Sequence, residues 1–167
     1  SVEVQHTEDG PKRTVASCHT PINPGMRIYT NSDRVKTLRR NIVELVLSDH
    51  PPDCLTCEVN GNCELQDVAA SVGVRRIRYA KGKNHCDREK DLSHAYMRMD
   101  LSKCINCSRC VRACDEVQGQ FTLTMTGRGF ESRITTDNDM LFGDSSCVSC
   151  GACAQTCPTS AISDVFQ

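Results

Sequence analysis

Eight cysteines in the C-terminal part of the chain form two copies of one spacing. The pattern C-x2-C-x2-C-x3-C occurs at Cys104, Cys107, Cys110 and Cys114, and again at Cys147, Cys150, Cys153 and Cys157. Three thiolates at this spacing surround one face of a [4Fe–4S] cluster, and the fourth cysteine ligates the partner cluster. The spacing therefore predicts two clusters, one held by Cys104, Cys107, Cys110 and Cys157, the other by Cys147, Cys150, Cys153 and Cys114.

A pair of four-cysteine zinc sites is the alternative interpretation of these residues. Zinc ribbons and knuckles usually place two C-x2-C pairs apart in sequence, whereas each copy here has a triplet and then a fourth cysteine. The spacing therefore favours iron–sulfur clusters. Small residues beside the triplets (Ser108, Gly151 and Ala152) allow backbone amides to approach the sulfurs. Such hydrogen bonds help to set a cluster's potential.

A third candidate site combines one histidine with three cysteines. The spacing H-x3-C-x2-C-x5-C joins His50, Cys54, Cys57 and Cys63, with Gly61 in the loop. Imidazole can replace a thiolate on iron, and because it is neutral it tends to raise the potential relative to an all-cysteine site. A zinc ion with three cysteines and one histidine fits the same spacing, so the residues alone leave both metals open.

The composition also favours metal over disulfide bonds. Of 167 residues, 13 are Cys, none is Trp and 4% are aromatic, so the core must be thin. Disulfide scaffolds scatter cysteines through the loops of short secreted chains. Here twelve of the thirteen follow residue 53, mostly in C-x2-C repeats. Metal binding in turn predicts a reducing compartment, which we take to be the cytoplasm.

Charge and hydropathy argue against two classes of partner. The net charge of −1 gives no bulk attraction to nucleic acid. No apolar run approaches the ~20 residues that span a bilayer. We therefore expect no nucleic-acid binding and no direct insertion into a membrane.

The elements that must position the ligands follow from periodicity and turn residues. Residues 1–30 are predicted as strands and turns, with β-like runs at 15–18 and 26–29. Apolar residues then repeat at helical spacing from 35 to 46, after a cap at 31–33. Pro51 and Pro52 end this helix and leave His50 at its C-terminal edge. Further predictions are a helix at about 64–71, a strand at 74–79, a polar loop at 81–91, short helices carrying the fourth cysteines, and a hairpin pairing 121–125 with 131–135.

The segment HPPDCLTCEVNGNCELQD (residues 50–67) resembles the [4Fe–4S] segment of a known family. That family includes the large iron–sulfur subunit of respiratory complex I, some [FeFe] hydrogenases, and the α subunits of NAD-linked molybdenum or tungsten formate dehydrogenases. The residues His50, Cys54, Cys57 and Cys63 match its four ligands one by one. The resemblance therefore favours iron over zinc at this site.

The C-terminal repeat is similar to the two-cluster bacterial ferredoxins, with Asp115 where a proline usually follows the first copy. CINCSRCVRACDEVQG (104–119) and SSCVSCGACAQTCPTSAISD (145–164) most closely resemble formate dehydrogenase α subunits. Hydrogenases come close, and the complex I subunit is more distant. In the formate dehydrogenases a molybdopterin domain would begin just after Gln167. The chain itself shows no catalytic site.

This resemblance implies a role in electron transfer. Electrons would leave a formate-oxidising molybdopterin centre outside this segment and pass through the two ferredoxin-like clusters to the His50 cluster. They would then reach a flavin-containing, NAD-linked partner subunit. The same relay in an [FeFe] hydrogenase or a complex I subunit is the alternative, and a structural zinc protein is a distant one.

ASCHTPINPGMRIYT (16–30) resembles the last part of a plant-type [2Fe–2S] domain, with Cys18 where the fourth ligand would stand. One cysteine cannot hold that cluster, so we expect a fragment cut inside the domain, or upstream ligands that are lost or lie on another chain. The implied fold is α+β in three parts. They are a truncated β-grasp segment (1–33), a helical domain with the histidine-ligated [4Fe–4S] site (34–96), and a two-cluster ferredoxin-like domain (97–167).

Two remaining features are expected to lie outside any site. Cys86 has no partner at ligand spacing and is predicted to be a surface or half-buried thiol, with His85 and His94 too scattered for a metal site. The basic run is predicted to be a solvated face, with docking of an acidic partner as the alternative. It comprises Arg75, Arg76, Arg78, Lys81 and Lys83.

Overall fold

Strands in the computed structural model, which describes residues 1–83 and 86–166, form three small antiparallel sheets. The strands are β1 (Val2–Gln5), β2 (Arg13–Val15), β3 (Arg27–Tyr29), β4 (Met97–Met99), β5 (Leu123–Thr126), β6 (Arg133–Thr136) and β7 (Ile162–Asp164). The α-helices are α1 (Asp33–Asp49), α2 (Glu64–Ser71), α3 (Arg109–Arg112) and α4 (Ala152–Thr156). Short 3-10 turns cover Cys54–Thr56, Leu101–Lys103, Gly129–Glu131 and Phe142–Asp144, and Ala113–Val117 is π-helical.

The N-terminal sheet has the order β2-β1-β3, with β1 pairing antiparallel to both neighbours. The sequence analysis predicted strands and turns over residues 1–30 but did not locate the central strand VEVQ, whose alternation spans only four residues. Its polar side chains, Glu3 and Gln5, are both buried, and the Gln5 amide donates to the carbonyls of Glu8 and Gly10. The predicted strands match β3 and overlap the end of β2. The β-grasp assignment stays a prediction.

Helix α1 confirms the predicted helix and sets the position of His50. Ser32 caps its first turn, where the amide of Val35 donates to the Ser32 hydroxyl at 3.3 Å. At the other end His50 leaves the helix with φ −83° and ψ 142°. This extended geometry is expected for a residue that precedes proline, because the ring of Pro51 disfavours helical torsions before it. The sequence thus turns His50 out of the helix into the following loop.

Helix α2 has the predicted bounds, and it contacts α1. The guanidinium of Arg40 on α1 donates to the carbonyl of Val72 at 3.2 Å, just beyond the end of α2. The strand predicted at 74–79 is wrong. Val74 to Tyr79 has no strand partner and is largely exposed, so its β-branched residues have no sheet to join.

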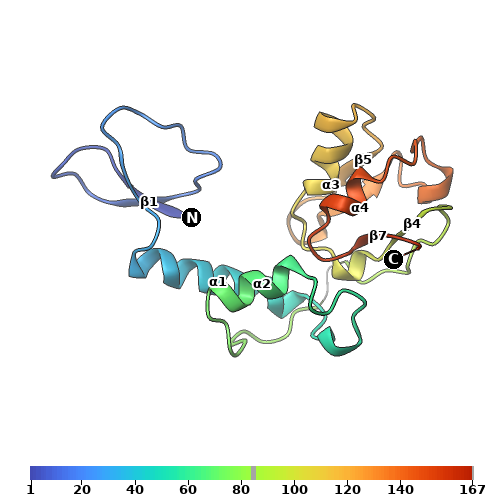
Figure 1. The fold of residues 1–167 in the computed structure, drawn as a ribbon, viewed down its shortest axis with the longest axis horizontal. Coiled ribbons are helices and arrows are strands. Elements are labelled where there is room, and N and C mark those ends of the chain that lie inside the picture. The colour runs from blue at the N-terminus through green and yellow to red at the C-terminus, as the bar shows by residue number, and fades with distance from the viewer. Residues whose placement is uncertain (84–85, 167) are drawn as a thin grey trace.

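The C-terminal unit lies at the opposite end of α1 from the N-terminal sheet (Figure 1). Strand β4 at its start pairs antiparallel with β7 at its end, with Met97 opposite Asp164. Helices α3 and α4 both lie between β4 and β7 in the sequence, and they contact each other. Neither β4 nor β7 was predicted, because three-residue strands carry too little periodicity.

The core of this unit is built from a few large apolar side chains and from sulfur. It contains Met97, Met99, Leu101, Leu123, Ile134, Phe142 and Ile162 together with Cys86, Cys110, Cys114 and Cys153. The predicted hairpin is confirmed as β5 and β6, displaced by one or two residues, with Leu123 opposite Thr136. Gly127 makes its turn with φ +74°, and a side chain there would collide with the backbone of Glu131.

Candidate metal centres

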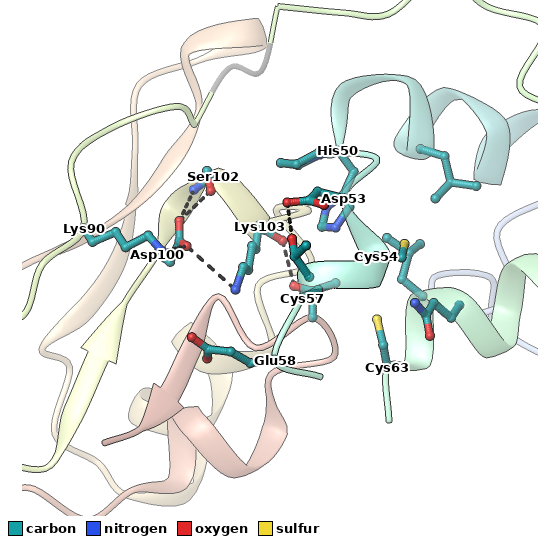
Figure 2. Close-up of a pocket in the computed structure, with 16 residues that line it drawn as sticks. His50, Asp53, Cys54, Cys57, Glu58, Cys63, Lys90, Asp100, Ser102 and Lys103 are labelled. Atoms are coloured by element: carbon teal, nitrogen blue, oxygen red, sulfur yellow. Dashed lines mark hydrogen bonds and ion pairs between the residues drawn. The ribbon is translucent and has the colours of Figure 1, made fainter. Parts of the chain in front are cut away.

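The structure places the predicted residues of the histidine site around one cavity of about 320 Å³. His50 comes from the end of α1, Cys54 and Cys57 from the turn that follows, and Cys63 from the residue before α2. Figure 2 shows these four residues on the helices and loop that border the cavity. The turn is closed by the Cys57 amide, which donates to the carbonyl of Cys54 at 3.3 Å. The local chain thus gathers one imidazole and three thiols.

His50 has the properties of a metal ligand. Its Nδ1 atom is buried and makes no hydrogen bond within the described residues, which costs free energy unless another group bonds to it. Burial, and after it the positive charge of Lys103, lower the pKa of His50 below its ordinary value. Nearby Asp100 and Asp49 act in the opposite direction but less strongly. The imidazole is therefore held neutral, the form that coordinates metals.

A second cavity is lined by three cysteines that are close in sequence and a fourth that is distant. Cys104, Cys107 and Cys110 come from the first triplet, and Cys157 follows α4. The rest of its wall is mainly apolar and includes Ile105, Ile134, Pro158 and Ile162. These are the four cysteines that the sequence analysis assigned to one cluster.

A third cavity gathers the other four cysteines. Cys147, Cys150 and Cys153 come from the second triplet, and Cys114 comes from the first copy. Cys114 lies in the π-helical segment Ala113–Val117 rather than on an α-helix, and such segments often occur at functional sites. Cys157, for its part, lies one residue beyond α4 in an extended conformation. The exchange of fourth cysteines between the two copies is thus present in the geometry, while their role as ligands stays a prediction.

The two copies share their backbone conformation around the triplets. Asn106 and Ser149 occupy equivalent positions with φ of 51° and 59°, and Ser108 and Gly151 do so with φ of 60° and 74°. In each copy the first of these left-handed residues donates its own amide to the sulfur two residues before it: the amide of Asn106 lies 3.4 Å from Cys104 Sγ, and that of Ser149 lies 3.4 Å from Cys147 Sγ. Backbone amides therefore approach the sulfurs at matching places, as the small residues suggested.

Two buried thiols, one in the second cavity and one in the third, are held neutral by their surroundings. Burial, followed by the charges of neighbouring cysteines, raises the pKa of Cys110 to about 12. Burial and the neighbouring Cys110 do the same for Cys153, whose pKa is also about 12. Neighbouring cysteines in these cavities thus raise the pKa of both Cys110 and Cys153. A cationic iron centre would reverse that penalty by favouring the thiolates.

Cys86 corrects one prediction, since it is fully buried rather than at or near the surface. Its thiol is hydrogen-bonded to Cys104, and this contact lowers the pKa of Cys86 and raises that of Cys104. No sequence pattern indicated this contact, because the two cysteines are eighteen residues apart in a polar loop and a triplet. A buried thiol that is outside the predicted ligand set therefore touches a member of it.

The other candidates lie apart from these cavities. Cys18 is exposed. His94 is buried, where its ring nitrogen contacts the Ser149 hydroxyl at 3.2 Å. His85 lies outside the described residues. The basic run is solvent-exposed as predicted, although Arg78 pairs with Glu44 at 2.7 Å.

Two negative findings hold for residues 1–83 and 86–166. No three His, Cys, Asp or Glu side chains there lie close enough together to hold a single metal ion, although four candidate ligands line each cavity. In the same ranges, no helix has the length and apolar character needed to cross a membrane.

Comparison with protein-family models finds iron–sulfur regions in two parts of the chain. Residues 39–78 match the NADH-ubiquinone oxidoreductase-G iron–sulfur binding region, and residues 103–161 match the 4Fe-4S dicluster domain. The first match contains the histidine site and the second contains both cysteine repeats. The chain therefore contains an iron–sulfur electron-transfer module, and the thiol-lined cavities fit such clusters in their donor chemistry.

Three curated relatives come from different oxidoreductases. The HndD subunit of the NADP-reducing hydrogenase of Solidesulfovibrio fructosivorans is 41% identical over 92% of this chain and 26% of its own length. A subunit of the NADH-quinone oxidoreductase of Rhizobium meliloti is 31% identical over 92% of this chain and 18% of its own length. A putative formate dehydrogenase of Staphylococcus haemolyticus is 34% identical over 89% of this chain and 15% of its own length. They do not single out a formate dehydrogenase α subunit.

A solved structure supports the fold over nearly the whole chain. A chain in the crystal structure of an NAD⁺-reducing [NiFe]-hydrogenase in the H2-reduced state superimposes with a TM-score of 0.84. It is 28% identical, and the match covers 98% of this chain and 67% of the other. The chain spans about a quarter, or less, of the length of the curated relatives it matches.

Proposed function

We propose that this chain is an electron-transfer module that binds three [4Fe–4S] clusters. Cluster 1 is held by His50, Cys54, Cys57 and Cys63. Cluster 2 is held by Cys104, Cys107, Cys110 and Cys157, and cluster 3 by Cys147, Cys150, Cys153 and Cys114. The observation that carries this proposal is that the four residues of each set line one cavity. When bound, such clusters would supply one-electron transfer, and the protein supplies their spacing, insulation and potential.

The residues around the cavities support the order cluster 3, cluster 2, cluster 1. Cys153 of the third set lies close enough to Cys110 of the second for their charges to interact. The second set meets the first where the amide of Glu64 donates to the carbonyl of Pro158 at 3.2 Å. Glu64 follows Cys63 and Pro158 follows Cys157 in sequence. A backbone hydrogen bond therefore links residues next to the first and second sets.

Analysis of iron and sulfide in the anaerobically purified chain tests the cluster count. We expect about twelve irons per chain and a broad absorbance near roughly 400 nm. Zinc in place of iron, or about eight irons, would contradict the three-cluster proposal. The first result would favour structural zinc sites, and the second would leave only the ferredoxin-like pair.

For the enzyme to which the module belongs, we propose a formate dehydrogenase with a molybdopterin centre and a flavin-containing, NAD-linked partner, in the cytoplasm. The support is the similarity of both cysteine repeats to formate dehydrogenase α subunits, together with a relative named as a putative formate dehydrogenase. A hydrogenase is the second candidate, favoured by the 41% identity to HndD. A complex I-type subunit is the third.

Selective reduction of the purified native complex distinguishes these enzymes. The complex is exposed anaerobically to formate, H2 and NADH in turn, and bleaching of the cluster absorbance is followed. Bleaching by formate supports the formate dehydrogenase. Bleaching by H2 without formate would assign the module to a hydrogenase, and bleaching by NADH alone would favour a complex I-type subunit.

A further inference from the structure

Two lysines line the cavity of the histidine site in addition to its four candidate ligands. Lys90 comes from the segment before β4, and Lys103 comes from the turn that immediately precedes Cys104. Their side chains differ in accessibility: that of Lys103 is 17% exposed, whereas that of Lys90 is 59% exposed. Solvent therefore screens the charge of Lys103 less than that of Lys90.

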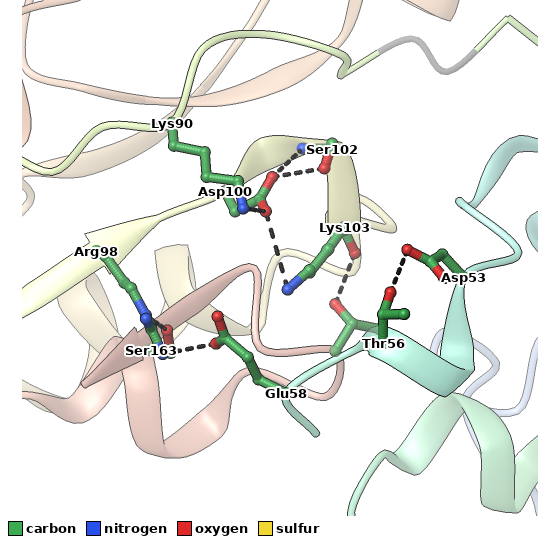
Figure 3. Close-up of polar contacts among 10 residues, drawn as sticks. Asp53, Thr56, Glu58, Lys90, Arg98, Asp100, Ser102, Lys103 and Ser163 are labelled. Carbon is green, nitrogen blue, oxygen red and sulfur yellow. Dashed lines mark hydrogen bonds and ion pairs between the residues drawn. The ribbon is translucent and has the colours of Figure 1, made fainter. Parts of the chain in front are cut away.

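Asp100 fixes both lysines at the cavity wall. One of its carboxylate oxygens lies 3.1 Å from Lys90 Nζ and 3.8 Å from Lys103 Nζ. The other accepts hydrogen bonds from the amide and the hydroxyl of Ser102, at 3.2 and 2.5 Å. Figure 3 shows this network, with the Lys103 side chain lying between Asp100 and Glu58. Because Ser102 holds the Asp100 carboxylate in place, Asp100 in turn defines the position of the Lys103 ammonium group.

The backbone of Lys103 is anchored as well. Its amide donates to the carbonyl of Asp100 at 3.2 Å, and its carbonyl accepts from the Thr159 hydroxyl at 2.7 Å. Glu58, the nearby acid, is engaged by Arg98 at 2.6 Å, and Arg98 in turn donates to Ser163. Lys103 is thus a mostly buried cation on the wall of the histidine-site cavity. It is also the residue before Cys104, a candidate ligand of the second set.

A positive charge on the wall of this cavity increases the electron affinity of a cluster bound there. Three thiolates give the bound cluster negative charge, and each added electron makes it more negative. A nearby positive charge stabilises the reduced form more than the oxidised form, and the effect is larger where solvent is excluded.

We propose that Lys103, held by Asp100, raises the midpoint potential of the cluster bound by His50, Cys54, Cys57 and Cys63. The proposal rests on the proposed function, because it concerns the potential of that cluster. It makes Lys103 a positioning residue for electron transfer: the ammonium group does not bind the cluster, and Asp100 determines where its charge lies.

Redox titration followed by electron paramagnetic resonance tests the proposal in the fully loaded chain. In Lys103→Gln the potential of cluster 1 should fall, whereas Lys103→Arg should keep it close to the original because the charge is retained. Asp100→Asn tests the positioning role: without the carboxylate the Lys103 ammonium should turn toward solvent, and the potential should fall by less than in Lys103→Gln. Lys90→Gln is the matched control and should cause a smaller shift, since that lysine is more exposed.

The outcomes separate the charge effect from packing and from the proposed function. Equal shifts in Lys103→Gln and Lys103→Arg, or no shift in Lys103→Gln, would overturn the proposal. If Lys103→Gln fails to retain cluster 1, Lys103→Met decides the question, because it keeps the apolar part of the side chain, and an unchanged or raised potential there contradicts the charge effect. Absence of cluster 1 from the unaltered chain, seen as about eight irons, would instead contradict the proposed function.

Discussion

The Sγ atom of Cys63 lies 3.7 Å from the carbonyl oxygen of Pro158. The two residues are 95 positions apart in sequence. Cys63 belongs to the first candidate ligand set, and Pro158 directly follows Cys157 of the second. The amide of Glu64 reaches the same carbonyl at 3.2 Å. This contact is where the histidine site meets the ferredoxin-like unit, and it connects the first and second sets through hydrogen bonds and covalent bonds.

An ion pair beside this contact should keep the two parts in register. Arg109 on α3 binds both carboxylate oxygens of Glu64, each at 2.7 Å. Because both side chains are about half exposed, Arg109→Met should lower the free energy of unfolding by less than about 1 kcal/mol. Its main effect should be local, with faster hydrogen exchange of the Glu64 amide.

Arg112→Met is the matched control for that exchange experiment. Arg112 makes a comparable exposed pair with Glu116, but both residues lie in the segment of α3 and the π-helical turn. Exchange of the Glu64 amide should not change in this variant. Equal exchange rates in the two variants would show that the Arg109–Glu64 pair does not hold the contact.

Substitutions at His50 distinguish a ligand from an ordinary buried histidine. In His50→Ala the fourth ligand is lost, and the iron content should fall from about twelve to about eight per chain. In His50→Cys the cluster should return with a lower potential, because an anionic thiolate replaces a neutral imidazole. His19→Ala, at an exposed histidine, should change neither quantity. Full iron content in His50→Ala would refute the ligand assignment.

The exchange of fourth cysteines can be tested by iron counting in combined variants. Cys107→Ala with Cys110→Ala should remove cluster 2 and leave about eight irons. Adding Cys157→Ala should then cost no further iron, because Cys157 belongs to the same set. Adding Cys114→Ala instead should lower the count again. The opposite result would mean that each copy binds its own cluster without exchange.

Sequence periodicity and spacing predicted the parts of this molecule that depend on local interactions. Helix α1 follows from a Ser cap, an apolar repeat and two prolines, and α2 has the bounds expected from its composition. The strand at 74–79 failed because β propensity has no effect without a neighbouring strand. Strands β4 and β7, in contrast, have partners but no local signal. Their pairing joins residues far apart in sequence, and a three-residue strand has no pattern of its own.

For the candidate sites too, the sequence predicted the local features and not the tertiary ones. Ligand spacing is local, so all twelve candidate ligands could be named in advance, and the structure gathers them in three cavities. What spacing could not reveal is the environment of these residues. Cys86 reaches Cys104 through tertiary packing, and Lys103 lines the histidine site only because its turn folds against the loop at Cys57.

Cys86 should act on cluster 2 without being one of its ligands. Its thiol is hydrogen-bonded to Cys104, and hydrogen bonds to a ligand sulfur help to set the cluster's potential. Cys86→Ala should therefore keep the full iron content but lower the potential of cluster 2. Cys86→Ser, which keeps a donor, should restore part of the difference. Loss of about four irons in Cys86→Ala would instead make Cys86 a ligand.

Removal of iron should loosen the C-terminal unit more than α1. Cluster 2 would tie Cys157 to residues 104–110, and cluster 3 would tie Cys114 to residues 147–153, so chelation removes cross-links that close long loops. Hydrogen exchange should then accelerate at the Asp100 amide, which donates to Ala161, and at the Val165 amide, which donates to Tyr96. The amides in the middle of α1 serve as the internal control, because no cross-link passes through them. Unchanged exchange at Asp100 and Val165 after chelation would contradict the cross-linking role.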